Sequence, residues 1–411
     1  MLKKIFFSNF ILVLLSTILV GIGFFLIFNL LLEVFFKITP PLGNHHDFLA
    51  FYSAAYLVLH GMIGKIFDAT SISNFELTII PYKVGAAGYM PFLNPPFVAV
   101  LLTPLAFLSP FSSRIIWFFL NFCLYLIALF YLTKTLQGKT RILSVILLLS
   151  TFPIYQALIE AQLSIIILVC SVFAINFVKE QRYFISGFFL SALWIKPQFA
   201  IIVVIGLILF RLWKVLFGMI FAGLMIFLIT LPLVGFGPYL TYINFAFGVF
   251  GSHFTGAGAL NQTAWQGDLS LTAGINGLFV AIFGQGSTIL VNTFTAVVAI
   301  VLVSFYWLAV TKIKPGFGNL GREIMLVVSF ILILLLDPHL YSQDVILLYL
   351  TLPLLLHRFR NSILVVILIS LISDLLLIKQ AVLAHSFTLI LIGFTIYFCW
   401  ISINSGEAAK S

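Results

Sequence analysis

Residues 5–36 read IFFSNFILVLLSTILVGIGFFLIFNLLLEVFF, an apolar run in which Glu33 is the only charged residue. A helix needs about 20 apolar residues to cross a lipid bilayer, so this run is long enough to do so. Lys3 and Lys4 precede it, and no small-residue cleavage site follows it. A secretory signal peptide has a shorter apolar core and such a site, so we expect a retained helix.

Apolar runs of this kind recur along almost the whole chain. Of its 411 residues, 62% are hydrophobic and 8% are charged, and the mean hydropathy is +1.21. Soluble domains carry about 25% charged residues, so this chain cannot cover a surface that faces water. The sequence therefore predicts an all-α polytopic membrane protein, a single domain over residues 1–411 with roughly 11 to 13 transmembrane helices.

The net charge of +9 would suggest nucleic-acid binding in a soluble domain. Here the basic residues gather between apolar runs, which is typical of cytoplasmic loops. With both termini in the cytoplasm, most of the 21 Lys and Arg residues fall inside and most of the 12 Asp and Glu residues fall outside. We therefore expect a multi-pass protein of a bacterial plasma membrane, with no nucleic-acid partner. The three cysteines show no disulfide or metal-binding spacing.

Two stretches between basic ends are too short for two full crossings. Residues 183–210 number 28, whereas two crossings need about 40 residues. Residues 322–357 repeat this pattern. We predict that each forms a sunken hairpin of two short helices, with tips at residues 194–198 and 337–341. Residues 95–108 are also too short to cross, and we expect them to form a helix at the outer interface.

Polar residues gather at the predicted outer ends of these helices, although they lie far apart in the sequence. Ionisable residues at membrane depth are candidates for function. Asp47 follows the first apolar run and opens an amphipathic stretch. It is a candidate N-cap of that helix and a candidate general base that takes a proton from an attacking hydroxyl, and the two roles can coexist. The adjacent His45 and His46 do not favour a metal site, because neighbouring histidines in a helix rarely bind one ion.

A lysine at a sunken hairpin tip is costly unless an anion meets it or its head reaches the surface. Lys196 is therefore a candidate to stabilise a phosphate leaving group. His339 and Tyr341, at the second tip, are further candidates to bind phosphate. Four polar residues are candidates to orient the substrates, with ordinary solvated turns as the alternative for the first three: Gln162, Asn261, Gln262 and Asp344.

Five features, in this order, resemble glycosyltransferase family 87. They are Asp47-Phe48-x-x-Phe51-Tyr52-x-Ala54-Ala55, the motif Tyr89 to Pro96, Gln162, Ile195-Lys196-Pro197, and Pro338-His339-x-Tyr341-x-x-Asp344. The resemblance covers about residues 40–355. The family usually has Gly-Gln where this chain has Ala161-Gln162.

The resemblance implies a GT-C fold and transfer of a sugar from a polyprenyl-phosphate donor at the outer membrane face. It implies that Asp47 is the base, that the anomeric carbon is inverted and that His339 lies near the donor phosphate. We expect a hexose such as mannose, a lipid or glycan acceptor, no cofactor and no metal. A transporter or glycolipid flippase is the alternative, although no internal inverted repeat is evident. A polymer ligase that uses a diphosphate-linked glycan is a weaker third hypothesis.

Overall fold

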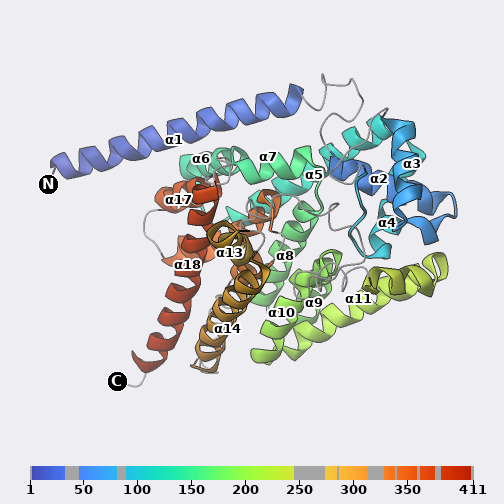
Figure 1. Ribbon diagram of the computed structural model, residues 1–411. Helices are drawn as coiled ribbons and strands as arrows, with labels where there is room; N and C mark the ends of the chain where they lie inside the picture. The colour runs from blue at the N-terminus through green and yellow to red at the C-terminus, as the bar shows by residue number, and fades with distance from the viewer. Residues whose placement is uncertain are drawn as a thin grey trace.

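A computed structural model describes residues 2–32, 46–80, 89–244, 274–284, 287–312, 328–337, 340–358, 362–374 and 381–408 (Figure 1). Within these ranges the regular structure is entirely helical. The prediction of an all-α chain is confirmed.

Four helices are long and apolar enough to cross a membrane. They are α1 (Leu2–Leu31), α5 (Pro110–Leu132), α11 (Trp213–Val234) and α14 (Thr288–Lys312). Their outward faces are apolar: on α11, Phe217, Ile229 and Leu233 are each more than 60% exposed. In water such a surface would be strongly unfavourable, so lipid must cover it. The chain is an integral membrane protein.

The other helices do not meet that criterion, and all of them except α18 are shorter than these four. They are α2 (His46–Leu59), η2 (Ile63–Lys65), α3 (Ala69–Ile79), α4 (Pro96–Leu102), η3 (Thr103–Phe107), α6 (Gly138–Leu149), α7 (Phe152–Ile159), α8 (Ser164–Lys179), α9 (Tyr183–Leu190), η4 (Ser191–Ile195), α10 (Pro197–Leu209), α13 (Ile275–Phe283), η8 (Ser342–Thr351), α16 (Leu352–Arg358), α17 (Ser362–Asp374) and α18 (Ala381–Ala408). The predicted 11 to 13 crossings stay a prediction, because most of them would have to be made by these shorter helices.

The apolar stretch at residues 138–159 does not form one continuous helix. It is broken between α6 and α7, which meet at an angle of 53°. Pro153 lies in the first turn of α7, where it lacks an N–H to continue the preceding helix. The freed N–H of Phe152 donates to the carboxylate of Asp374 on α17 at 2.7 Å. This bond matters because backbone groups freed within a membrane domain need protein partners.

Residues 183–209 form the predicted short hairpin. Its arms are α9 with η4 and α10, and Lys196 lies at the tip between them. The helix α9 packs against α11, with Gly187 and Gly218 at the contact. A Cβ atom on Gly218 would overlap the carbonyl oxygen of Phe184. Small residues allow this close approach, as they do between many transmembrane helices.

The segment before α5 forms a separate group of helices, α2, α3 and α4 with η3, beside α5 and one end of α11 (Figure 1). The expected interfacial helix at residues 95–108 is α4 followed by η3. The hydroxyl of Tyr52 on α2 donates to the carbonyl of Leu108 at 2.8 Å. Glu76 is 2% exposed, and its two oxygens accept from the N–H of Met90 at 3.0 and 3.2 Å. These contacts fix the proline-rich motif to α2 and α3.

We predict that Gly218→Ala loosens the hairpin that carries Lys196. The added methyl group meets a backbone carbonyl, so α9 and α11 must move apart, at a cost of about 1–3 kcal/mol. Thermal unfolding in detergent measures this loss. Gly393→Ala on α18 is the matched control, because nothing lies within 4 Å of a Cβ atom there. Equal melting temperatures for the two variants would show that the α9–α11 contact is not tight.

Candidate active site

Asp47 and Gln162 meet although 115 positions separate them. Asp47 lies in the first turn of α2, and Gln162 lies in the turn between α7 and α8. The amide of Gln162 donates a short hydrogen bond to Oδ2 of Asp47. The carboxylate is therefore directed to a distant element of the fold. This contact gives Asp47 a long-range partner in addition to any role as a local N-cap.

The turn that presents Gln162 is held by α5. Ala161 has a φ of 55°, in the left-handed region that favours glycine. The indole N–H of Trp117 donates to the carbonyl of Ala161 at 2.7 Å. Arg114 donates to the carbonyl of Ile159 at 3.3 Å. Two side chains from the first half of a spanning helix thus satisfy the carbonyls at the end of α7.

Lys196 lies at the hairpin tip, immediately before α10, and meets a carboxylate. Its ammonium is 2.5 Å from Oδ1 of Asp344, and the two side chains are 15% and 2% exposed. The hydroxyl of Ser164, at the start of α8, donates to the same oxygen. The ion pair joins α8, the α9–α10 hairpin and η8 at one point. A buried charge requires such partners, because desolvation otherwise costs several kcal/mol.

The proline-rich motif contacts the same hairpin tip. Asn94 is buried, and its amide donates to the carbonyl of Ile195 at 3.0 Å. That carbonyl belongs to the residue directly before Lys196. The motif at residues 89–96 therefore helps to position the lysine. The sequence predicted an interfacial helix from residue 95, and the contact of Asn94 with Ile195 gives the motif before it a further role.

The surroundings of Asp47 tune its acidity. Its helix, α2, is not one of the helices long enough to cross the membrane. Burial raises the pKa of Asp47 to about 7, and the negative charge of Glu160 acts in the same direction. The positive charge of Lys196 and the hydrogen bond from Gln162 oppose the rise. A carboxyl group with a pKa near neutral pH suits general base catalysis, because it is ionised often and still basic enough to take a proton.

Tyr341 lies near these charges in the segment before η8 and is 40% exposed. Burial of its hydroxyl raises its pKa to about 12, and the carboxylates of Asp47, Asp337 and Asp344 add to this rise. The phenol therefore remains protonated at neutral pH and can donate a hydrogen bond.

Asp337 is 2% exposed, and Gly274 lies close to its backbone. A Cβ atom on Gly274 would lie 2.6 Å from the carbonyl oxygen of Asp337.

Five of the eight predicted site residues come together at one end of the helices: Asp47, Gln162, Lys196, Tyr341 and Asp344. The other three, Asn261, Gln262 and His339, lie outside the described residues. Sequence reasoning missed Ser164 as the second partner of Asp344 and Glu160 as a charge acting on Asp47. Within the described ranges, no group of three or more His, Cys, Asp or Glu side chains is arranged to hold a metal ion.

The family model of glycosyltransferase family 87 matches residues 92–338, more than half of the chain. The chain belongs to glycosyltransferase family 87. The matched segment includes Gln162 and Lys196, and Asp47 precedes it. Searches of the curated proteins and of the solved structures gave no match. Family 87 membership identifies the chain as a membrane glycosyltransferase, and it decides for an enzyme against the transporter hypothesis.

We predict strong coupling between Lys196 and Asp344 in a double-mutant cycle. Either single change, Lys196→Met or Asp344→Leu, leaves a buried charge without its partner and should cost about 3–5 kcal/mol of stability. The double variant should lose clearly less than the sum, because it contains neither charge. Thermal unfolding in detergent provides the four values.

The exposed pair Arg182 and Glu180 is the matched control for that cycle. Their side chains are 3.7 Å apart and more than half exposed, so their coupling should be below about 1 kcal/mol. Additive losses for Lys196 and Asp344 would contradict the role of the ion pair as a tie between the three elements.

Proposed function

We propose that the protein transfers one sugar from a polyprenyl-phosphate donor to a hydroxyl group of a lipid or glycan acceptor, with inversion at the anomeric carbon. The observation that carries this proposal is the pairing of a carboxyl group of near-neutral pKa, Asp47, with a buried cation, Lys196, in one site. A sugar transfer from a phosphate needs a base for the acceptor and a positive charge for the leaving group.

The reaction breaks one bond and forms one bond. The acceptor oxygen attacks the anomeric carbon from the side opposite the phosphate, and its proton passes to the carboxylate of Asp47. The bond between the anomeric carbon and the phosphate oxygen breaks, and the electron pair leaves with the polyprenyl phosphate. Lys196 stabilises the negative charge that develops on this oxygen. Because the base and the leaving group lie on opposite faces of the sugar, the configuration inverts.

The phosphate requires donors beyond those used within the protein. An ammonium group has three N–H donors, and Asp344 accepts from Lys196 at 2.5 Å, so further donors remain for a ligand. Tyr341 supplies a hydroxyl donor, and we assign His339 to the same phosphate. Gln162, Asn261 and Gln262 are assigned to orient donor or acceptor. Asp344 is almost fully buried, which supports an indirect role through Lys196.

The position of the site relative to the apolar layer supports a lipid-linked donor. Arg114 and Trp117, which hold the turn of Gln162, lie in the first two turns of the spanning helix α5. The phosphate of a membrane lipid lies at this boundary between apolar core and water. The Lys and Arg bias along the chain favours the outer face for this end of α5. The preference for a hexose such as mannose rests on the resemblance to the family's motifs.

We expect Asp47→Asn to lower turnover by about 100- to 10,000-fold, because an amide cannot take the acceptor proton. The assay uses purified protein with a panel of radiolabelled polyprenyl-phosphate sugars and a membrane lipid extract, and the donor that yields labelled product names the sugar. Donor binding, measured separately, should persist because Lys196 is intact. Asp68→Asn is the matched control, since Asp68 caps α3 through Ser71 and Asn is an equally good cap. Near-normal turnover by Asp47→Asn would falsify the assignment of the base.

We expect kcat/KM to rise with pH through about 7, because the reaction needs Asp47 in its ionised form and this ratio reports the free enzyme. Glu160→Gln removes a negative charge that raises the pKa of Asp47, so the acid limb should move to lower pH. Lys196→Gln removes a charge that lowers this pKa, so any residual activity should show the limb at higher pH. Shifts in the same direction for both variants would contradict the electrostatic account of Asp47.

A further inference from the structure

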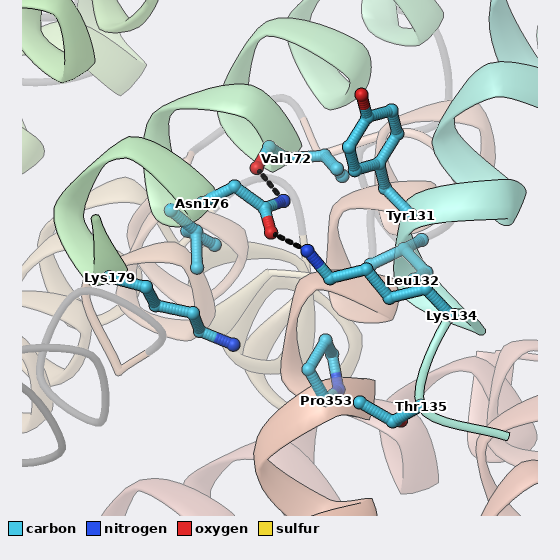
Figure 2. Close-up of a pocket in the computed structure, with 9 residues that line it drawn as sticks. Tyr131, Leu132, Lys134, Thr135, Val172, Asn176, Lys179 and Pro353 are labelled. Atoms are coloured by element: carbon cyan, nitrogen blue, oxygen red, sulfur yellow. Dashed lines mark hydrogen bonds between the residues drawn. The ribbon is translucent and has the colours of Figure 1, made fainter.

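A small hollow lies between the ends of α5 and α8, beside the start of α16. The cavity volume is about 20 Å³, and one side opens to solvent. The nine residues that line it include two lysines and no carboxylate: Tyr131, Leu132, Lys134, Thr135, Val172, Ile175, Asn176, Lys179 and Pro353 (Figure 2). None of these residues belongs to the site around Asp47.

The hollow and the site around Asp47 lie at opposite ends of the same two helices. On α5, Trp117 contacts the turn of Gln162, and Tyr131 lines the hollow 14 residues later. On α8, Ser164 contacts Asp344 at the start, and Lys179 lines the hollow at the end. At 1.5 Å per residue, about 21 Å separates the two levels along each helix. The hollow therefore lies well toward the opposite side of the apolar layer, which is about 30 Å thick.

The lysines of the hollow are held where an anion could reach them. The ammonium of Lys134 donates to Oδ1 of Asn176 at 2.5 Å and lies 5.4 Å from the ring centre of Tyr131. The amide of Asn176 is oriented in turn by its bond to the carbonyl of Val172 at 2.8 Å. These partners are neutral, so the positive charge is positioned without being neutralised. In Figure 2 the side chain of Lys179 extends toward the space between Lys134 and Pro353.

The charges around the hollow are predominantly positive. Lys139 and Arg141 follow the end of α5 in the sequence, and Arg182 follows α8. The nearby carboxylate of Glu180 is exposed and pairs with Arg182 at 3.7 Å. Lys134 and Lys179 both line the hollow, so an anion that enters it meets two positive charges. Basic pockets between transmembrane helices on the cytoplasmic side of membranes characteristically bind lipid phosphates.

We propose that this hollow binds the phosphate group of an anionic membrane phospholipid, at the membrane face opposite the glycosyltransferase site. The open side of the hollow admits the headgroup. In the preceding turns of α5, the apolar side chains of Ile127 and Phe130 are exposed and can contact acyl chains. A soluble phosphate ion has the same chemistry as the headgroup and is the competing source. The proposal is independent of the sugar-transfer reaction, because its ligand and its test do not involve the donor.

The test is lipid retention by the full-length protein, measured by native mass spectrometry after detergent purification. The delipidated protein is incubated with phosphatidylglycerol or with phosphatidylcholine at equal concentration. The variant is Lys134→Gln with Lys179→Gln, and the matched control is Lys65→Gln with Lys214→Gln, which removes two charges away from the hollow. We expect phosphatidylglycerol to bind the pocket variant about tenfold more weakly than the wild type or the control. Binding of phosphatidylcholine should not change.

Further measurements distinguish a phospholipid headgroup from a soluble phosphate ion as the ligand of the hollow. Inorganic phosphate is compared with chloride at equal ionic strength for its effect on thermal unfolding. A stabilising effect that the pocket variant loses, without any effect on lipid retention, would assign the hollow to soluble phosphate and overturn the lipid proposal. Equal lipid retention by the pocket variant and the control would overturn it as well. Lys179→Gln alone keeps the Lys134–Asn176 bond, so it serves if the double variant folds poorly, and Lys134→Arg with Lys179→Arg should restore binding.

Discussion

Lys196 carries a full positive charge to the tip of a hairpin whose two arms are apolar helices, and Asp344 offsets the cost of placing it there. The pair is 2.5 Å apart, and Ser164 completes the coordination of the same carboxylate oxygen. The three residues come from three different elements. Lys196 and Ser164 precede Asp344 by 148 and 180 positions. A buried charge without its partner is strongly unfavourable. The ion pair therefore tightly constrains the relative placement of α8, the hairpin and η8.

The same constraint explains why irregular backbone surrounds the site. Turns and helix ends within a membrane domain expose carbonyls that water cannot reach, so protein side chains must satisfy them. Trp117 does this for Ala161, and Asn94 does it for Ile195. Each satisfied carbonyl is adjacent in sequence to a candidate functional side chain, Gln162 or Lys196. Contacts that stabilise the broken helices therefore also aim the polar groups of the site.

The parts of this architecture that depend on spacing were predictable. The distance between basic ends was too short for two full crossings, which predicted the hairpin with Lys196 at its tip, and the structure confirms it. The polarity of Asp47, Gln162 and Lys196 in an apolar chain also predicted a shared site, and the structure brings them together. Both inferences follow from the cost of a charge in lipid, which composition and spacing reveal.

The parts that depend on long-range packing were not predictable. Ser164 is an ordinary residue at a helix start until Asp344 is placed beside it. The bend between α6 and α7 requires Asp374 to satisfy the freed N–H of Phe152 across 222 positions, and no local pattern signals that contact. The left-handed conformation of Ala161 gives a physical reason why glycine is usual in the family at this position. Here the indole of Trp117 helps to stabilise a conformation that costs alanine about 1–2 kcal/mol.

The polar groups of the site bond to one another. Gln162 donates to Asp47, and Asp344 accepts from Lys196, so substrates must enter a network whose members already have partners. The positive charge of Lys196 lowers the pKa of Asp47. In the proposed reaction the negative charge of the donor phosphate offsets that positive charge, so the pKa of Asp47 rises when the donor binds. The carboxylate then becomes a stronger base once the donor is bound, when the acceptor has an anomeric carbon to attack. Coupling of this kind would limit proton abstraction to the complete complex, and it arises because one lysine acts on both the phosphate and the base.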